Sequence, residues 1–411
     1  MASITNIEWA DSSWSGWLSC TKTGSEACRF CYAEALLDKR LHIVEWGQGK
    51  PRKRTSVQNW NQVHKWNRTP FYQCMACGKR GTEAELLKTD ESICDCFKHM
   101  APARRRVFCS SLSDVFDNEV PPEWRTDVMR LIESTPNLDW MLLTKRIGNV
   151  KKMMPPEAWT DGKWPSHVWL GATVCNQAEA DRDIPKLLEI PTSIRFLSIE
   201  PLLGKIDIAK WLDPWTCAMC GYHGAESDSG PCLCGNCDIE AVYDAKIGSA
   251  VCPSCNKNDG QSDDVGNSCP KCRAVGEWSR DYGHKFDNND HFIDWVIVGG
   301  ESGPHARPMH PAWATQLQKQ CEAAGVAFLF KQWGEWLPLP HFPYQDLSIL
   351  RADEVDNDVI YMDGTIMTKG NWQGPEGEGA HMCKVGKKEA GKILNGYSHL
   401  EFPKVTTANN D

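Results

Sequence analysis

Residues 168–199, VWLGATVCNQAEADRDIPKLLEIPTSIRFLSI, contain two short apolar runs separated by one amphipathic stretch. The runs, residues 168–173 and 194–199, have the length and the side chains of buried strands. The stretch between them begins at Asn176, a residue type that caps helix N-termini. A strand, a helix and a second strand in this order indicate a parallel β–α–β unit with a right-handed crossover.

The same alternation continues on both sides of this unit. Further apolar runs are RVFCS at 106–110, LDWMLLT at 138–144, DWVIV at 294–298 and VAFLF at 326–330, with SGWLS at 15–19 as a shorter one. Two more stretches with helical character are PPEWRTDVMRLIESTP at 121–136 and HPAWATQLQKQCEAAG at 310–325. The pattern predicts an α/β fold, a partial (β/α) barrel of six or seven parallel strands within residues 1–337, with a doubly wound sheet as the alternative.

Composition narrows the class of protein. The chain has 411 residues, 41% of them hydrophobic, and a net charge of −9, so no global basic field calls for nucleic acid. No run of apolar residues is long enough for a membrane span and the N-terminus has no signal-peptide pattern. We expect a cytoplasmic protein without a membrane partner. Its 20 cysteines, in a reducing compartment, indicate metal binding and not disulfides.

Two cysteine-rich segments interrupt the alternation, at residues 60–103 and 213–290, and a less regular extension follows at 338–411. The second segment carries one spacing twice, in Cys217-x2-Cys220-x13-Cys234-x2-Cys237 and in Cys252-x2-Cys255-x13-Cys269-x2-Cys272. Two pairs of thiolates at this spacing are typical of a zinc ribbon, and such a site can hold together a segment that is too small to fold by burial. We expect two Zn²⁺ sites here; a further iron–sulfur site is the minor alternative, and Cys232 could replace Cys234.

The first segment is less regular. Its cysteines are Cys74, Cys77, Cys94 and Cys96, with His99 as a substitute ligand. We favour a third zinc site over free thiols. These insertions either contact a protein partner or nucleic acid, or cover an edge of the barrel.

Three cysteines near the N-terminus, Cys20, Cys28 and Cys31, have the spacing C-x7-C-x2-C, and no fourth cysteine follows nearby. A structural zinc site takes four protein ligands, whereas three thiolates leave one iron of a [4Fe–4S] cluster open for a substrate or cofactor. The spacing therefore favours an iron–sulfur cluster. A zinc site completed by a remote residue and three free thiols are the alternatives.

In a (β/α) barrel, binding and catalytic residues follow the C-terminal ends of the strands. Polar side chains and glycines occupy these positions here, namely Ser111, Asp114, Thr144, Lys145, Thr173, Glu200, Gly299, Gly300, Glu301 and Lys331. The two glycines would let the backbone approach a ligand closely. We expect the lysines to balance a carboxylate as catalytic residues and the other residues to bind a cofactor.

Four strings resemble a phage- and prophage-encoded family that is known for a three-cysteine motif and is grouped with the radical S-adenosylmethionine (SAM) superfamily. They are Cys20-x7-Cys28-x2-Cys31-Tyr32-Ala33-Glu34, FLSIEPLLG at 196–204, WVIVGGESGPHARPMHP at 295–311 and FLFKQWGEW at 328–336. The resemblance covers most of the chain apart from the two insertions. It implies a partial (β/α) barrel in the host cytoplasm, a [4Fe–4S] cluster on Cys20, Cys28 and Cys31, a fourth iron that chelates SAM, and an external electron donor.

Two features depart from the superfamily pattern. The first gap in the cysteine motif is seven residues and not three, and Gly299-Gly300-Glu301 lies late in the chain, whereas the superfamily's Gly-Gly-Glu follows an early strand. The role of binding the SAM amine is therefore open between Glu301 and the early residues Ser111 and Asp114. We also expect Tyr32 to pack over the cluster and restrict solvent.

The substrate is predicted to be a nucleobase in DNA or RNA. Besides the phage context and the ribbons, the prediction rests on a stretch in which cations alternate with aromatic residues, as in proteins that bind single strands. The stretch comprises Lys50, Arg52, Lys53, Arg54, Trp60, Lys65, Trp66, Arg68, Phe71 and Tyr72, and Arg104–Arg105–Arg106 adds to it. A radical enzyme acting on a peptide or small metabolite, and a non-catalytic metal-bound interaction module, are the alternatives.

Overall fold

The computed structural model describes residues 5, 7–88, 94–154, 159, 164–212, 292–339, 357–368 and 379–403. It also describes a small antiparallel sheet of β11 (Cys232–Cys234), β12 (Ile239–Asp244) and β13 (Ser249–Val251). Of the eight cysteines predicted to form the two ribbons, Cys234 lies on β11 and the other seven lie outside the described residues. Both ribbon sites therefore stay predictions.

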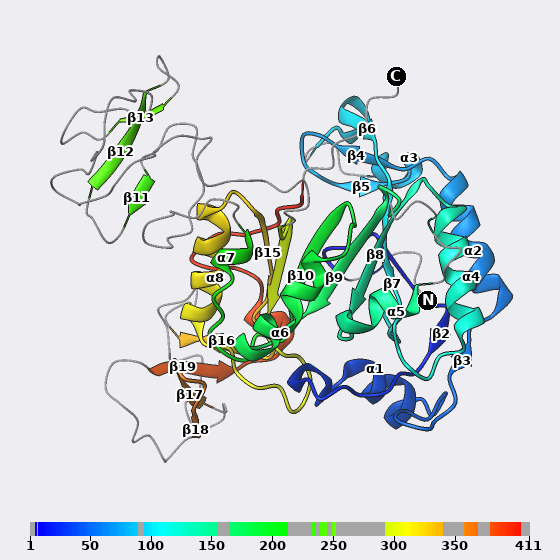
Figure 1. Ribbon diagram of the computed structural model, residues 1–411, viewed down its shortest axis with the longest axis horizontal. Coiled ribbons are helices and arrows are strands. Elements are labelled where there is room, and N and C mark those ends of the chain that lie inside the picture. Colours follow the sequence, from blue (N-terminus) through cyan, green and yellow to red (C-terminus); the bar gives the residue numbers. More distant parts are fainter. Residues whose placement is uncertain are drawn as a thin grey trace, which may run out of the picture.

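A seven-stranded parallel sheet forms the centre of the molecule (Figure 1). Its strands, in sheet order, are β1 (Ser12–Trp14), β7 (Arg105–Cys109), β8 (Leu138–Thr144), β9 (Val168–Thr173), β10 (Ile194–Ile199), β14 (Trp295–Gly299) and β15 (Ala327–Gln332). Sheet order follows chain order without reversal, as in a (β/α) barrel and unlike a doubly wound sheet. The predicted partial barrel is confirmed.

The first strand differs from the prediction. The strand of the sheet is β1, whereas SGWLS contributes only β2 (Trp17–Leu18), which pairs antiparallel with β3 (Lys53–Arg54). Thr55 accounts for the break, because its backbone N–H and side chain donate to the carbonyls of Ser15 and Gly16 at 2.9–3.0 Å. The chain then leaves the sheet and starts the loop that carries Cys20.

Helices cover the outer face of the sheet. They are α2 (Val57–Arg68), α4 (Pro122–Glu133), α5 (Val150–Met153), α6 (Gln177–Leu188), α7 (Ala209–Leu212) and α8 (Pro311–Ala323). Alternate residues of each strand join them in one hydrophobic core, for example Trp140 on β8 with Ile132 on α4 and Leu187 on α6. Because burial of apolar area drives folding, this layer supplies most of the stabilisation.

The inner face of the half barrel is filled with aromatic side chains. Phe108, Trp169, Phe196 and Trp295 point to this side from four strands, and Trp9 from the N-terminal segment packs among them. Gly171 is required here, since a Cβ at this position would lie 2.4 Å from the Phe196 ring. The half barrel is therefore a solid core at this level and not a channel.

Residues near the C-terminus cover the free edge of β15. Leu400 forms an antiparallel bridge with Leu329, and the amide of Phe330 donates to the His399 carbonyl at 3.0 Å. Phe402 then packs on Trp295, with 5.0 Å between the ring centroids. Pairing an exposed edge in this way removes a site for edge-to-edge aggregation.

The extension contains a second, four-stranded sheet. Its strands, in sheet order, are β16 (Trp336–Pro338), β19 (Gly379–Lys384), β17 (Asn357–Tyr361) and β18 (Ile366–Thr368). The extension also contains a short helix, α9 (Lys387–Ala390), which is bounded by Gly386 and Gly391 with φ values of 87° and 68°. Positive φ values end a helix, and glycine adopts them without a steric penalty.

The cysteines of the first insertion belong to a small separate sheet. It consists of β5 (Arg80–Gly81), β4 (Tyr72–Cys74) and β6 (Met100–Pro102), beside the short helix α3 (Glu83–Leu86). The predicted insertion began at Trp60, but α2 carries Val63 and Trp66 in the main core, so the separate sheet begins at Tyr72. Because β6 leads directly into β7, the sheet lies at the N-terminal ends of the barrel strands.

A cluster of charges joins this small sheet to the barrel. Arg80 forms an ion pair with Asp11, just before β1, at 3.0 Å, and the Asp139 carboxylate on β8 lies 3.7 Å from Arg104. Burial raises the pKa of Asp139 to about 6, although Arg104 and Arg106 oppose the shift. The Asp139 carboxyl therefore takes up a proton in the folded protein at a pH where the unfolded chain has lost it.

This shift predicts a pH dependence of stability. Between about pH 4 and pH 6 the folded state binds the extra proton, so rising pH lowers the free energy of unfolding by about 2–3 kcal/mol. Asp139→Asn should flatten this part of the curve, measured as urea midpoints at several pH values. Asp127→Asn, which alters an exposed carboxylate, should keep the wild-type slope. An unchanged slope in Asp139→Asn would contradict the assignment.

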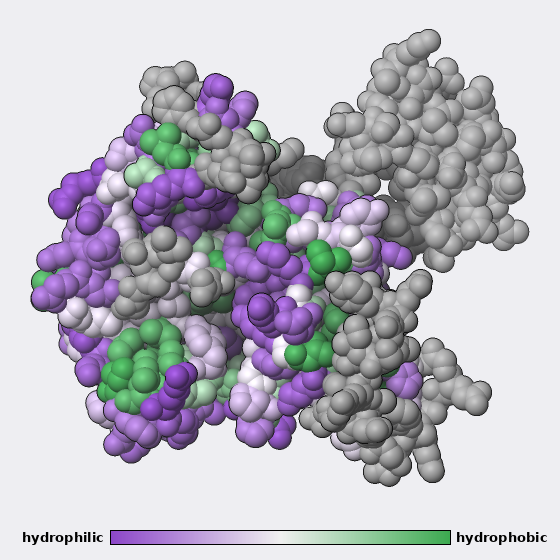
Figure 2. All heavy atoms as spheres, turned by 180° about the vertical axis from the view of Figure 1, so that it is seen from behind, coloured by the Kyte–Doolittle hydropathy of each residue, from purple (hydrophilic) through white to green (hydrophobic). Residues whose placement is uncertain are grey.

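The surface of the described residues is mostly hydrophilic, with small hydrophobic patches (Figure 2). Large exposed hydrophobic side chains include Val57, Met75 and Tyr397, which come from separate elements. Among the described residues, no helix combines the length and the apolar character needed to cross a bilayer.

Candidate functional site

A cavity of about 500 Å³ lies at the C-terminal ends of the barrel strands. This volume is within the range of small-molecule sites. Most of the residues predicted from strand ends line it, namely Ser111, Asp114, Lys145, Thr173, Glu200, Gly300, Glu301 and Lys331. Thr144 and Gly299 do not. The rule that strand ends converge therefore located the site, while the roles of its residues stay predictions.

Cys20, Cys28 and Cys31 line the same cavity, so the structure brings the predicted trio to the barrel mouth. Cys20 follows β2, and Cys31 comes directly before the helical turn α1 (Tyr32–Glu34) and a π-helical segment at Ala35–Arg40. Among the described residues, the group whose ligand atoms lie close enough together to hold a metal ion is Cys74, Cys77, Cys94 and Cys96, and the trio does not meet this spacing.

Arginines and aspartates hold the loop around Cys20. Arg146, after β8, donates to Asp114 at 3.0 Å and lies 3.8 Å from the Cys20 sulfur. Arg52 donates to Asp117 at 2.7 Å, and Asp117 in turn accepts from the amide of Thr21 at 3.3 Å. Burial, reinforced by Asp114, raises the pKa of Cys20 to about 12, against the opposing effect of Arg146. Without a bound metal this thiol is protonated.

Asp114 does not have the free oxygen expected of an amine-binding residue. Its Oδ1 accepts from the Thr144 hydroxyl at 2.8 Å and the Phe116 amide, and its Oδ2 accepts from Arg146 and the Lys145 amide at 3.0 and 3.2 Å. Thr144 thus supports Asp114 from outside the cavity. Both residues fix the loop after β8, because a buried carboxylate with four donors is already satisfied.

Tyr32 links the cysteine loop to β7. Its hydroxyl donates to the carbonyl of Ser111, and burial of that hydroxyl raises the pKa of Tyr32. The ring itself lines the cavity, and the residue is 57% exposed. Tyr32 therefore forms part of the cavity rim.

Glu301 is engaged in a clamp across the mouth. Its two carboxylate oxygens accept from Arg307 at 2.8 Å each, and Arg307 also donates to the Glu26 carboxylate at 2.6 Å. Glu26 precedes Cys28 by two residues, so the clamp ties the loop after β14 to the cysteine loop. The expected contact between Glu301 and an ammonium group would have to compete with this bidentate ion pair.

Removing Arg307 should loosen the cysteine loop. Arg307→Ala leaves the carboxylate of Glu301, 6% exposed, without its partner, and it removes charge-assisted hydrogen bonds of about 1.5–3 kcal/mol. Amide hydrogen exchange of residues 24–31 should accelerate at least tenfold. Arg29→Ala removes a more exposed and longer contact to the same Glu26 and should change exchange little. Equal exchange in the two variants would contradict the clamp.

The two glycines at the end of β14 make room for neighbouring protein atoms. A Cβ on Gly300 would lie 1.9 Å from the Trp333 carbonyl oxygen, and one on Gly299 would lie 2.7 Å from Glu200. Close packing against protein thus explains why both positions need glycine, and the expectation that they let a ligand approach the backbone stays a prediction. Glu200 uses this space to form an ion pair with Lys331 at 2.9 Å, so Lys331 is not a free cation either.

Thr173 differs from these residues. Its hydroxyl is buried and makes no hydrogen bond with any described residue, although Thr173 lines the cavity at the end of β9. Buried hydroxyls are normally satisfied, so an unpaired one at a cavity wall is available to a ligand.

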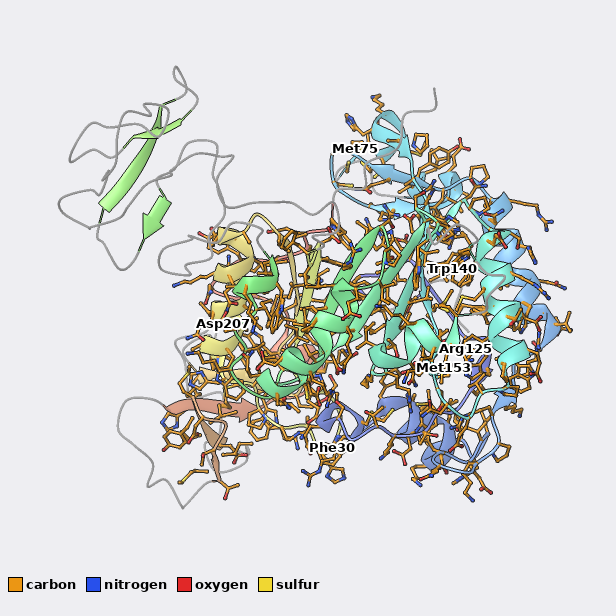
Figure 3. The ribbon with its side chains drawn as sticks, in the orientation of Figure 1. Phe30, Met75, Arg125, Trp140, Met153 and Asp207 are labelled. Atoms are coloured by element: carbon orange, nitrogen blue, oxygen red, sulfur yellow. The ribbon has the colours of Figure 1, made fainter. Side chains whose placement is uncertain are left out.

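Cys74, Cys77, Cys94 and Cys96 form a separate metal-binding group. Their sulfur atoms all lie within 4.8 Å of one another, and the predicted grouping of these residues is confirmed. Four thiolates at this spacing could bind a metal ion such as zinc. Figure 3 shows Phe30, the residue before Cys31, and Met75, the residue after Cys74, at opposite ends of the part of the chain whose side chains it draws. The quartet is therefore remote from the cavity.

Much of the predicted nucleic-acid stretch is internal. Arg52, Trp66 and Phe71 are buried, as are Arg105 and Arg106. Arg105 lies over the Phe71 ring at 4.4 Å and Arg106 over Phe402 at 3.6 Å. These side chains hold the fold together and cannot contact a nucleic acid.

Two residues around the site carry no signal in the sequence. Arg307 closes the mouth from outside the cavity wall, and Lys387 lines the cavity from α9 in the C-terminal extension. Trp9, which also lines the cavity, lies just before the start of β1 and not after a strand end.

Comparison with known proteins gives one match. A family described as "Protein of unknown function (DUF5131)" matches residues 4–403. No curated protein matches the chain. No solved structure matches it.

Proposed function

Because the chain belongs to the DUF5131 family, whose description assigns no activity, we propose its function from the site itself: an iron–sulfur enzyme of the radical SAM type. One observation carries the proposal. Cys20, Cys28 and Cys31 line the same cavity as the C-terminal ends of the barrel strands. This end of a (β/α) barrel is where catalytic sites are found.

The three thiols fit a [4Fe–4S] cluster better than a zinc ion. They come from one short loop, they offer three ligands and not four, and they are spread more widely than the Cys74 quartet. A zinc site with tetrahedral geometry draws its ligands close together, whereas the thiolates of a cluster bind different irons. When bound, the cluster and SAM would supply a 5′-deoxyadenosyl radical, with the electron coming from an external donor.

The residues of the chain would bind, orient and shield these groups. Arg146 places a positive charge 3.8 Å from Cys20, and this charge opposes the rise in the pKa of Cys20 that burial causes. Tyr32 covers one side of the rim, and Trp9 and Phe108 form an apolar floor. Such walls keep water and other hydrogen donors away from a reactive intermediate.

The tight sulfur spacing of the Cys74 quartet supports a structural zinc site. It lies in the small sheet at the N-terminal ends of the barrel strands, opposite the cavity. We therefore assign it to stabilising that sheet, where the small hydrophobic cluster around Leu86 is too limited to do so alone.

We propose that the substrate is a nucleobase in DNA or RNA, and the support now comes from residues at the mouth of the cavity. The mouth of the cavity carries Phe30, whose ring lies 5.3 Å from the Arg29 guanidinium and 5.2 Å from that of Arg307. Tyr32 is exposed beside it. Aromatic rings next to arginines suit the stacking of unpaired bases near a phosphate backbone. A peptide or small metabolite is the alternative substrate.

Anaerobic reconstitution of the full-length protein tests the proposal. We expect about four irons and four sulfides per chain besides zinc. Under reduction, the protein should convert SAM to 5′-deoxyadenosine. A colourless protein that holds only zinc would contradict the proposed enzymatic function and would favour the alternative of a non-catalytic, metal-bound interaction module. Nucleic-acid binding should weaken steeply as the salt concentration rises. If the protein bound no nucleic acid, a peptide or small metabolite would be the favoured substrate.

A further inference from the structure

The charged side chains around the cavity mostly neutralise one another. Arg146 pairs with Asp114 at 3.0 Å and Lys331 with Glu200 at 2.9 Å. Glu301 pairs with Arg307, which lies outside the cavity wall. Lys22 pairs likewise with Glu34 at 2.6 Å. Each carboxylate on the wall therefore has a cation beside it.

Two cations remain. Lys145 and Lys387 line the cavity, and neither forms an ion pair with any residue that the structure describes. Within this part of the chain, the cavity thus has an excess of positive charge. Such an excess attracts an anion and gains strength where the walls are apolar.

The two lysines reach the cavity from different sides. Lys145 follows β8, the third strand of the sheet, and its neighbour Arg146 lies 3.8 Å from the Cys20 sulfur. Lys387 starts α9, which is held near the loop after β15, the seventh strand, by the bonds from Gly386 to Glu335 and from Trp333 to Gly391. One lysine thus lies near the cysteine loop and the other at the far end of the sheet.

A second observation points to a ligand between them. Thr173 lies at the end of β9, the middle strand of the sheet, and is only 3% exposed. Its hydroxyl has no hydrogen-bond partner among the described residues. A ligand that spans the cavity would give this hydroxyl a hydrogen bond. It would also bring separate groups to each lysine.

We propose that Lys387 binds an anionic group, a phosphate or a carboxylate, of the substrate. The inference rests on the proposed function only in treating the cavity as the active site, because anion binding itself needs no cluster. It gives the C-terminal extension a role, since α9 delivers a specificity residue to the mouth of the barrel. Lys145, near the cysteine loop, is left for the cofactor.

Titration of the purified, zinc-containing full-length protein tests this assignment without reconstitution. The probes are AMP and succinate at low salt, where charge contacts are least screened, and SAM is titrated separately into the reconstituted protein, because its proposed binding needs the cluster. Lys387→Met should weaken the binding of AMP, succinate or both by about tenfold and leave SAM unaffected. The probe that responds identifies the anion as phosphate or carboxylate. Lys387→Arg should retain most of the affinity.

Lys388→Met is the matched control, because Lys388 is the next residue of the same helix and does not line the cavity. Equal binding in both methionine variants, or no binding of AMP and succinate by the wild type, would overturn the assignment. If Lys387→Met weakened only the binding of SAM, Lys387 would be a cofactor-binding residue, and its assignment to the substrate would be wrong. Iron content after reconstitution reports on the proposed function separately, since Lys387→Met should not change it.

Discussion

Cys28→Ala should abolish the iron and sulfide that the wild type binds on anaerobic reconstitution, while zinc content stays unchanged. Cys28 is buried at the cavity wall, and its sulfur lies 3.3 Å from the Thr23 hydroxyl. With only Cys20 and Cys31 left, two of the four irons would lack protein ligands, and a cluster normally held by thiolates would not persist. Formation of 5′-deoxyadenosine should fall to background with it.

Two further variants make the result specific. Cys321→Ala alters a buried cysteine of α8 that lies away from the cavity, and it should keep both iron and activity. Cys74→Ala should do the reverse of Cys28→Ala, losing about one zinc per chain and keeping the iron. If Cys28→Ala lost zinc and no iron, the trio would be a zinc site and the proposed function would be wrong.

The strands of the barrel could be predicted from sequence because each is buried on both faces. Such strands read as continuous apolar runs, and β8, β9 and β10 begin and end where the runs do. The first strand is short and is followed by residues that bond to Thr55, so its position depends on a contact that the local sequence does not reveal. Filling of the inner face by Trp9 and Phe402 depends on contacts between the two ends of the chain.

For the site, too, the sequence predicts the positions of the residues but not their contacts. Strand-end positions converge in any parallel barrel, so the predicted residues Thr173 and Glu200 do line one cavity with the cysteines. What each side chain does there depends on its partners. Glu301 is held by Arg307, and Arg307 reaches Glu26 across 281 positions of sequence. No local pattern predicts such a pairing, so residue type and strand-end position predict where these side chains lie but not which partners they bind.

The second large effect concerns the ion pair beneath the cysteine loop. The side chains of Arg52 and Asp117 are 1% and 0% exposed and lie 2.7 Å apart. Arg52→Met should lower the free energy of unfolding by about 3–5 kcal/mol, because it leaves a buried carboxylate without its main partner. The loss should appear in the urea midpoint, and iron binding should weaken as well, since Asp117 also holds the amide of Thr21 beside Cys20.

The double variant Arg52→Met, Asp117→Asn separates a buried charge from lost packing. Removing both charges should recover part of the stability, since a neutral pair leaves no uncompensated ion. Arg54→Met is the matched control two positions further along the chain, on β3, because its ion pair with Asp127 is about one-third exposed, with side-chain exposures of 37% and 38%. Exposed pairs contribute about 1 kcal/mol or less, so this variant should lose little. If Arg52→Met and Arg54→Met proved equally stable, the buried pair would not support the loop that carries Cys20.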